Sequence, residues 1–234
     1  MDKLQKYKPT DKMIDLIGDN YSLLQVMSRF GLSLGFGDKT VKEVCEMSNV
    51  DCQTFLVVVN FMAEGFSRMD GSADDISIPA LVDYLRQAHI YFLDYCLPAI
   101  RRKLIEAIDC SQDDVSFLIL KFFDGYMREV RKHMEYEEKT VFKYVDTLIH
   151  GNAPKNYQIS TFSKHHDQVG ERLTELKNII VKYCPAKANT NVLNAALFDI
   201  YACEEGLESH CKVEDYLFVP AILKLERRMR ENEK

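Results

Sequence analysis

Two pairs of histidine and glutamate have the spacing of metal ligands. His133 is followed by Glu137 and His210 by Glu214, each pair four residues apart. On an α-helix, residues four apart project from one face about 5–6 Å from each other, so both members of a pair can reach one metal centre. Imidazole with carboxylate suits iron, manganese or zinc. Two such pairs on two helices predict a metal site, and a helical-bundle setting without thiolate ligands favours iron.

Further histidines could complete the ligand set. His89 precedes the first pair, and the adjacent His165 and His166 lie between the two pairs. Adjacent helical residues point about 100° apart, so only one of His165 and His166 can face the core. Glu129, one turn before His133, is a candidate hydrogen-bond partner or proton relay behind the ligands, although capping or salt bridging is the favoured role.

Four long helices must position these residues. Apolar residues recur at three- and four-residue spacing, without strand-like alternation, over residues 80–108, 111–148, 160–183 and 189–228. Four long helices joined by short loops form most simply an up-down-up-down bundle. At 1.5 Å per residue, His89 lies about 28 Å from the end of its helix and His133 about 33 Å from the start of the next, so their depths agree. Glu138 lies off the His133 face, and we expect it to be solvated.

A polar, breaker-rich segment, residues 69–79, separates the bundle from the N-terminal part of the chain. We expect the domain boundary there, with a small helical domain over residues 1–70 and the bundle over residues 80–234. The first domain has short helical patterns over residues 11–17, 21–30, 41–47 and 52–66. Thr40 and Asp51 are predicted helix N-caps.

Composition places the chain among globular proteins. It has 234 residues, 47% hydrophobic and 28% charged, and 30 Lys and Arg against 36 Asp and Glu give a net charge of −6. This balance disfavours nucleic acid and anionic membranes as partners. The seven cysteines are scattered without a CxxC pair, and no apolar run reaches the length of a membrane span. We therefore expect a cytoplasmic protein.

The histidine and carboxylate pattern resembles the hemerythrin-like di-iron bundles. It is closest to the repair-of-iron-centres family, whose members protect or restore iron–sulfur clusters under nitrosative and oxidative stress. The resemblance covers about residues 80–225 and implies a carboxylate-bridged pair of non-haem iron ions, with the ligands His89, His133, Glu137, His166, His210 and Glu214. In this register His165 lies beside the site or faces solvent. The resemblance assigns no catalytic residue, and it leaves a homodimer open.

The N-terminal domain also resembles the small helical domain of that family, with one departure. Family members carry adjacent cysteines in a loop that here reads Gly-Leu-Ser-Leu-Gly-Phe-Gly over residues 31–37. Cys45 and Cys52, at helical positions, are poor substitutes. A repair step that depends on those thiols is therefore in question for this chain.

Three functional hypotheses follow. The first is a di-iron stress protein that binds or reduces NO or O2 species and aids damaged iron–sulfur proteins. The second is a sensor of a diatomic gas or of iron that acts through protein contacts of the N-terminal domain. Residues 40–61 could be read as a helix-turn-helix, but residues 1–70 carry a net charge of −2 and residues 51–66 have no basic side chain, which argues against DNA. The third is a metal-free helical interaction module, which would make the aligned ligands a coincidence.

Overall fold

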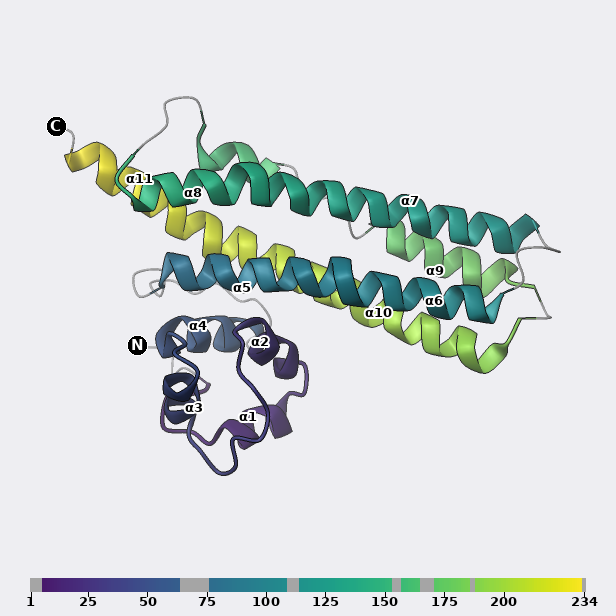
Figure 1. The fold of residues 1–234 in the computed structure, drawn as a ribbon, viewed down its shortest axis with the longest axis horizontal. Coiled ribbons are helices and arrows are strands. Elements are labelled where there is room, and N and C mark those ends of the chain that lie inside the picture. The colour runs from purple at the N-terminus through teal and green to yellow at the C-terminus, as the bar shows by residue number, and fades with distance from the viewer. Residues whose placement is uncertain are drawn as a thin grey trace. The chain divides into compact units, whose positions relative to one another are not determined.

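The described part of the chain is helical throughout (Figure 1). The computed structural model describes residues 6–63, 76–108, 114–152, 157–164, 171–185 and 188–232. Within these ranges the one extended pairing is an isolated bridge between Lys12 and Thr40. The predicted all-α class and helical bundle are confirmed. Residues 69–75 of the predicted linker lie outside the described residues, so the domain boundary there stays a prediction.

The first helices of the chain are short, and the later ones join into longer helical stretches. The short helices are α1 (Met13–Asp19), α2 (Leu23–Arg29), α3 (Val41–Met47) and α4 (Cys52–Ala63). The longer stretches contain α5 (Ile78–Ile90), η2 (Tyr91–Cys96), α6 (Leu97–Ala107), α7 (Asp114–Tyr136), η3 (Glu137–Val141), α8 (Phe142–Ile149), η4 (Ile159–Lys164), α9 (Glu171–Tyr183), α10 (Thr190–Val213), η5 (Glu214–Phe218) and α11 (Val219–Asn232). Segments η2, η3 and η5 are π-helical, and η4 is a 3₁₀-helix.

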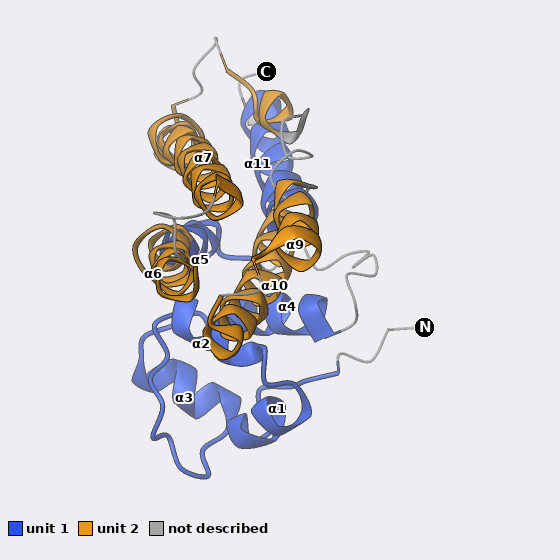
Figure 2. Ribbon diagram, turned by 90° about the vertical axis from the view of Figure 1, so that its right-hand side faces the viewer, with its two compact units in different colours: residues 1–88, 212–234 blue, residues 89–211 orange. Residues whose placement is uncertain are grey.

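The chain divides into two compact units, coloured separately in Figure 2. The first unit comprises residues 1–88 and 212–234, and the second comprises residues 89–211. The long helical rod that begins at Thr190 continues through η5 into α11 and thus contributes to both units.

Helix α4 forms the core of the N-terminal helices. All of its residues from Thr54 to Phe61 are buried. Asn60 in this run bonds the backbone of Tyr7 twice: its side-chain oxygen accepts from the Tyr7 N–H at 2.8 Å, and its amide donates to the Tyr7 carbonyl at 3.0 Å. A buried amide satisfied in this way is compatible with an apolar core. The reciprocal bonds hold the start of the chain on α4.

The helix ends in this region carry the expected capping chemistry. Thr40 and Glu43 form a capping box at the start of α3, in which each side chain accepts from the other residue's backbone N–H. The Asp51 carboxylate accepts from the Thr54 N–H at 2.7 Å at the start of α4. Both predicted N-caps are confirmed. Helix α2 ends at Arg29, and Gly31 just beyond it has a φ of 73°, which favours glycine and lets the Leu32 N–H reach the Met27 carbonyl at 2.9 Å.

The second unit contains helices α6, α7, α9 and α10, seen nearly end-on in Figure 2. Helix α7 shows why they pack: its buried residues recur at three- and four-residue spacing and form one apolar stripe of Ile119, Phe123, Tyr126, Val130 and Met134. Burial of each large apolar side chain contributes about 1.5–3 kcal/mol relative to exposure. Most of the binding between these helices therefore comes from this stripe and its partners.

Ion pairs set the register between neighbouring helices of the second unit. Arg101 on α6 makes a two-pronged bond to Asp124 on α7, with N···O distances of 2.7 and 3.2 Å. Lys103 on α6 bonds Asp199 on α10 at 2.6 Å. Lys177 on α9 pairs with Glu204 on α10. The pairs of Arg101 and Lys103 are partly exposed and contribute up to about 1 kcal/mol each, so they orient the helices more than they stabilise them.

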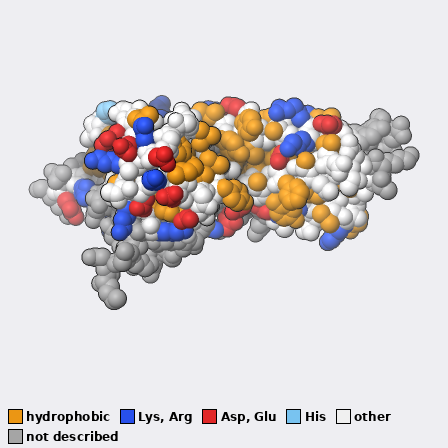
Figure 3. Space-filling model, turned by 90° about the horizontal axis from the view of Figure 1, so that it is seen from below, with side chains coloured by type: hydrophobic (Ala, Val, Ile, Leu, Met, Phe, Trp, Pro, Cys, Tyr) orange, Lys and Arg blue, Asp and Glu red, His pale blue; other side chains and the backbone are white. Residues whose placement is uncertain are grey.

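Charges of both signs share the surface. On the face in Figure 3, Lys and Arg side chains are interspersed with Asp and Glu, and hydrophobic side chains gather between them. Within the described residues, no helix is both long and apolar enough to cross a membrane.

Candidate metal centre

Glu137 is the central residue of the site. Its side chain is fully buried, and its two oxygens face two different imidazoles. Oε2 lies 2.9 Å from Nε2 of His89, and Oε1 lies 2.8 Å from Nε2 of His133. The His133 pairing spans one helical turn, as its four-residue spacing predicts. The His89 pairing joins residues far apart in the sequence, at the end of α5 and the start of η3.

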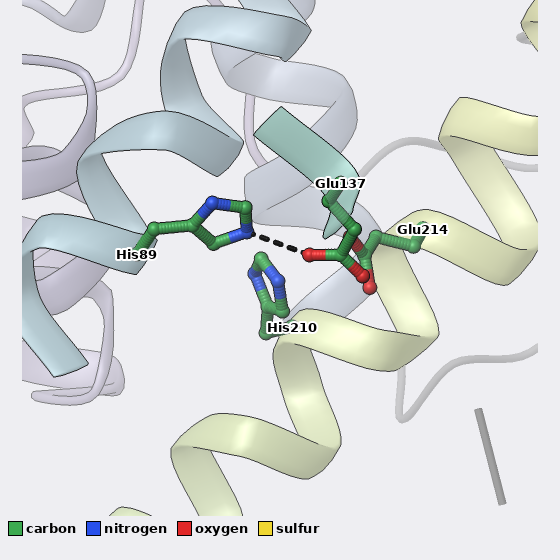
Figure 4. A group of neighbouring side chains, drawn as sticks. All are labelled: His89, Glu137, His210 and Glu214. Carbon is green, nitrogen blue, oxygen red and sulfur yellow. Dashed lines mark ion pairs between the residues drawn. The ribbon is translucent and has the colours of Figure 1, made fainter. Parts of the chain in front are cut away.

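His210 and Glu214 complete a group of four side chains. Ligand atoms of His89, Glu137, His210 and Glu214 all lie within 4.8 Å of one another, and all four side chains are buried. Figure 4 shows the two imidazoles and two carboxylates converging, with the ion pair of His89 and Glu137 dashed. The rings of His89 and His210 meet edge-to-face, with centroids 5.1 Å apart. The structure thus brings together four of the six predicted ligands in one group.

The other predicted site residues have different positions. His133 stands at the rim: it bonds Glu137 but is 15% exposed and does not belong to the group of four. His166, the sixth predicted ligand, and His165 lie outside the described residues. Glu129 is not brought to the group; it forms an ion pair with Arg172 in which both side chains are about half exposed.

Three π-helical segments begin at or close to residues of the group. Segment η3 begins at Glu137, η5 begins at Glu214, and η2 begins two residues after His89. A π-helical turn inserts one extra residue into an α-helix and is frequent at functional sites. Sequence patterns of three- and four-residue spacing do not reveal such turns, so they were not predicted.

Aromatic rings close the site around the imidazoles. Phe142 stacks on the His89 ring with centroids 5.5 Å apart and an interplanar angle of 12°. Phe92 meets His210 edge-to-face at 6.1 Å. Both phenylalanines are fully buried. The donor atoms therefore lie in an apolar surrounding, where electrostatic interactions are stronger than in water.

Glu138 contacts the site through His89, a contact that was not predicted, although its side chain stays partly solvated. Its Oε1 lies 3.0 Å from Nδ1 of His89, and its side chain is 37% exposed. The contact was missed because regular α-helical geometry places Glu138 about 100° from Glu137, whereas the segment that begins at Glu137 is π-helical. The adjacent pair of glutamates was the only signal in the sequence.

A layer of polarisable side chains lies seven residues from three of the histidines. Cys96, Tyr126 and Cys203 are seven residues from His89, His133 and His210, respectively, and all three are buried. Burial raises the pKa of the Tyr126 phenol well above its usual range, and Cys203 raises it further. The Tyr126 hydroxyl has no hydrogen-bond partner within the described part of the chain. This phenol thus stays protonated at all physiological pH values.

The two cysteines of the N-terminal region have raised thiol pKa values. Cys45 is fully buried, and burial, with the neighbouring Cys52 thiol, raises its pKa far above the ordinary value. Burial also raises the pKa of Cys52, which is partly exposed. Because the thiolate is the reactive form, neither residue has the properties of an activated cysteine.

The donor set fits a metal centre. Buried carboxylates are costly unless they are paired or coordinate a cation, and Glu137 and Glu214 are both fully buried beside imidazoles. Carboxylate oxygen with imidazole nitrogen suits borderline first-row ions such as iron, manganese and zinc.

The fold and this cluster define a helical-bundle metal-binding protein. A family described as the hemerythrin HHE cation binding domain matches residues 80–222. The match covers more than half of the chain, and the chain belongs to this hemerythrin family. No curated protein matches the chain.

Proposed function

We propose that this protein holds two non-haem iron ions in a carboxylate-bridged centre and handles NO or O2 species during nitrosative or oxidative stress. The observation that carries the proposal is the placement of Glu137: a fully buried carboxylate with one oxygen 2.9 Å from His89 and the other 2.8 Å from His133. The family match supports metal binding, and the iron pair and its ligand are our inference.

Six residues would hold the ions. Four of them form the described group, His133 stands beside it, and His166 is proposed from the sequence pattern: His89, His133, Glu137, His166, His210 and Glu214. When bound, such an iron pair supplies redox chemistry and open positions for a small diatomic ligand. The chain's own residues set the conditions for that chemistry.

The protein side chains exclude water and fix the ligands. Phe142 stacks on the His89 ring, Phe92 meets His210 edge-to-face, and neither imidazole is more than 3% exposed, so bulk water does not reach them. His133 is the partly exposed member, which makes its side of the site the entrance for a small molecule. A dry, preorganised site strengthens the interaction of the carboxylates with any cation that enters.

Exposure of the anaerobically reconstituted protein to NO tests this function. We expect optical and Mössbauer changes that depend on the bound iron, and loss of those changes in His133→Ala and Glu214→Ala. His150→Ala is the matched control, because His150 ends α8 at the surface and bonds only Asp146 among the contacts described for it. A protein that binds iron but shows no spectral response to NO or O2 would contradict the proposal.

Repair of iron–sulfur clusters is the finer part of the proposal. The loop over residues 31–37 has no cysteine, and the pKa values of the Cys45 and Cys52 thiols are both raised by burial. We therefore expect any iron delivery to run from the metal centre without an N-terminal thiol relay. Transfer of iron to an apo cluster protein measures this, and Cys45→Ala with Cys52→Ala should leave the rate unchanged. A rate that falls with those cysteines would contradict this route.

A sensor that acts through protein contacts is the second candidate. Helix α4 is buried from Thr54 to Phe61, so it is a core helix with little exposed surface that could enter a nucleic acid groove. Tyr21, Leu34 and Met47, in contrast, are large apolar side chains with exposures of 82, 71 and 66%. Crosslinking in cell extract with and without NO tests this candidate. The sensor function predicts a crosslinked protein adduct that forms only with NO and is lost in Leu34→Ser.

A further inference from the structure

We propose that Glu138 is a positioning residue that fixes the ring orientation and tautomer of His89 at the metal centre. This inference rests on the proposed metal function. Two neighbouring carboxylates contact the two nitrogens of a single imidazole: Glu137 Oε2 lies 2.9 Å from Nε2, and Glu138 Oε1 lies 3.0 Å from Nδ1. Glu137 belongs to the buried group, whereas Glu138 stands on the opposite edge of the ring.

The local helix geometry makes this arrangement accessible. In a regular α-helix the side chains of adjacent residues diverge by about 100°, which would carry one of the two carboxylates away from the ring. Here Glu137 and Glu138 open the π-helical segment η3, whose turn is wider than that of an α-helix. The same rod supplies Phe142, which stacks on the ring at 5.5 Å. One stretch of helix therefore contacts the face and both edges of His89.

The chemistry of the two contacts assigns their roles. An ionised carboxylate can only accept hydrogen bonds, so Nδ1 donates its proton to Glu138. The tautomer that results leaves the Nε2 lone pair directed toward the buried group. A metal-binding histidine commonly donates its second N–H to a carboxylate, which fixes the ring and makes the ligand more basic. Glu138 is 37% exposed, so its charge remains hydrated while it performs this role.

Substitution of Glu138 tests the inference. We expect Glu138→Ala to weaken metal binding about 10–100-fold, measured by competition with a chelator using Co2+ and Fe2+. Glu138→Gln keeps an acceptor oxygen without the charge and should give an intermediate affinity. Glu135→Ala is the matched control: Glu135 lies on the same helix, is exposed, and bonds Lys139 at 2.7 Å. This control should bind metal as the unsubstituted protein does.

A spectroscopic readout separates positioning from general stability. In the Co2+-loaded protein, the His89 Nδ1 proton should give a shifted, slowly exchanging NMR signal, because it is hydrogen-bonded to Glu138. The signal should survive in Glu138→Gln and in Glu135→Ala and disappear by exchange in Glu138→Ala. Circular dichroism verifies folding. If Glu138→Ala does not fold, the metal affinity of Glu138→Gln tests the inference: an intermediate affinity supports the role of Glu138, and an unchanged affinity contradicts it.

The outcomes distinguish this inference from the function on which it rests. Unchanged affinity and an unchanged N–H signal in Glu138→Ala, with metal bound, would overturn the role of Glu138 and leave the metal centre intact. Failure of the unsubstituted protein to bind Co2+ or Fe2+ would overturn the proposed function and this inference with it. Loss of affinity in Glu138→Ala but not in Glu135→Ala supports both.

Discussion

Nε2 of His89 and Oε2 of Glu137 lie 2.9 Å apart although 48 residues separate them in the chain. This contact joins the end of α5 to the start of η3. Neither partner has more than 3% of its side chain exposed, so a charged carboxylate and an imidazole are both held away from water. Burial of such a pair is energetically unfavourable unless the groups are well paired or coordinate a metal ion.

Removing the charge of Glu137 should abolish metal binding with little change in the shape of the side chain. We expect Glu137→Gln to lose most of its bound metal, because the amide is a weak ligand for hard and borderline cations. Metal analysis of the purified variant, with Glu135→Gln as the exposed control, provides the measurement. Retention of full metal content in Glu137→Gln would show that the carboxylate is not a ligand.

The pair of Lys177 and Glu204 should contribute to stability. The two side chains are 11 and 20% exposed, Thr174 also donates to Glu204 at 2.7 Å, and Lys177 lies 4.2 Å from the centre of the Tyr201 ring. Glu204→Ala leaves a mostly buried ammonium without its carboxylate, and we expect a loss of about 2 kcal/mol in the free energy of unfolding.

Chemical denaturation measures this loss, and a metal-free sample removes any contribution of bound ions. Glu46→Ala, which breaks the exposed pair with Lys42, is the control and should have no measurable effect. Equal stability of Glu204→Ala and the unsubstituted protein would contradict the expectation.

The capping box at α3 should respond to pH in a defined direction. The Thr40 N–H and then the Thr40 hydroxyl bond the Glu43 carboxylate and lower its pKa. A depressed pKa means that the contribution is present above the ordinary carboxyl pKa and is lost as pH falls through the lower folded value. Thr40→Ala should move the Glu43 pKa back toward its ordinary value, as followed by NMR titration, whereas Thr40→Ser should not. An unchanged pKa in Thr40→Ala would show that the hydroxyl does not contribute.

Cys45 should resist modification in the folded protein. Its thiol is buried and its pKa is raised, so the thiolate is scarce at neutral pH. Peptide mass spectrometry after brief alkylation should find Cys45 unmodified until denaturant is added. Rapid modification of Cys45 under native conditions would contradict the shielded position and reopen a thiol-based role for the N-terminal domain.

The sequence predicts those parts of the site that obey regular helix spacing. His133 with Glu137 and His210 with Glu214 are one turn apart, and the burial of Glu137, His210 and Glu214 follows from that shared face. The caps at Thr40 and Asp51 were predictable because they depend on local side-chain chemistry.

Residues that depend on irregular or long-range geometry were missed. Glu138 reaches His89 beside a π-helical turn that periodicity does not encode. Glu129 pairs with Arg172, which is the salt-bridging role favoured from the sequence, although the identity of its partner on α9 could not be inferred from spacing.

The most direct test of the central claim is the amount of iron bound after anaerobic reconstitution. The purified chain, loaded with Fe2+ under exclusion of oxygen and freed of unbound metal, should retain two iron ions per chain. The variants Glu137→Gln and His210→Ala should each retain clearly less. Fewer than one iron ion per unsubstituted chain would contradict the di-iron centre.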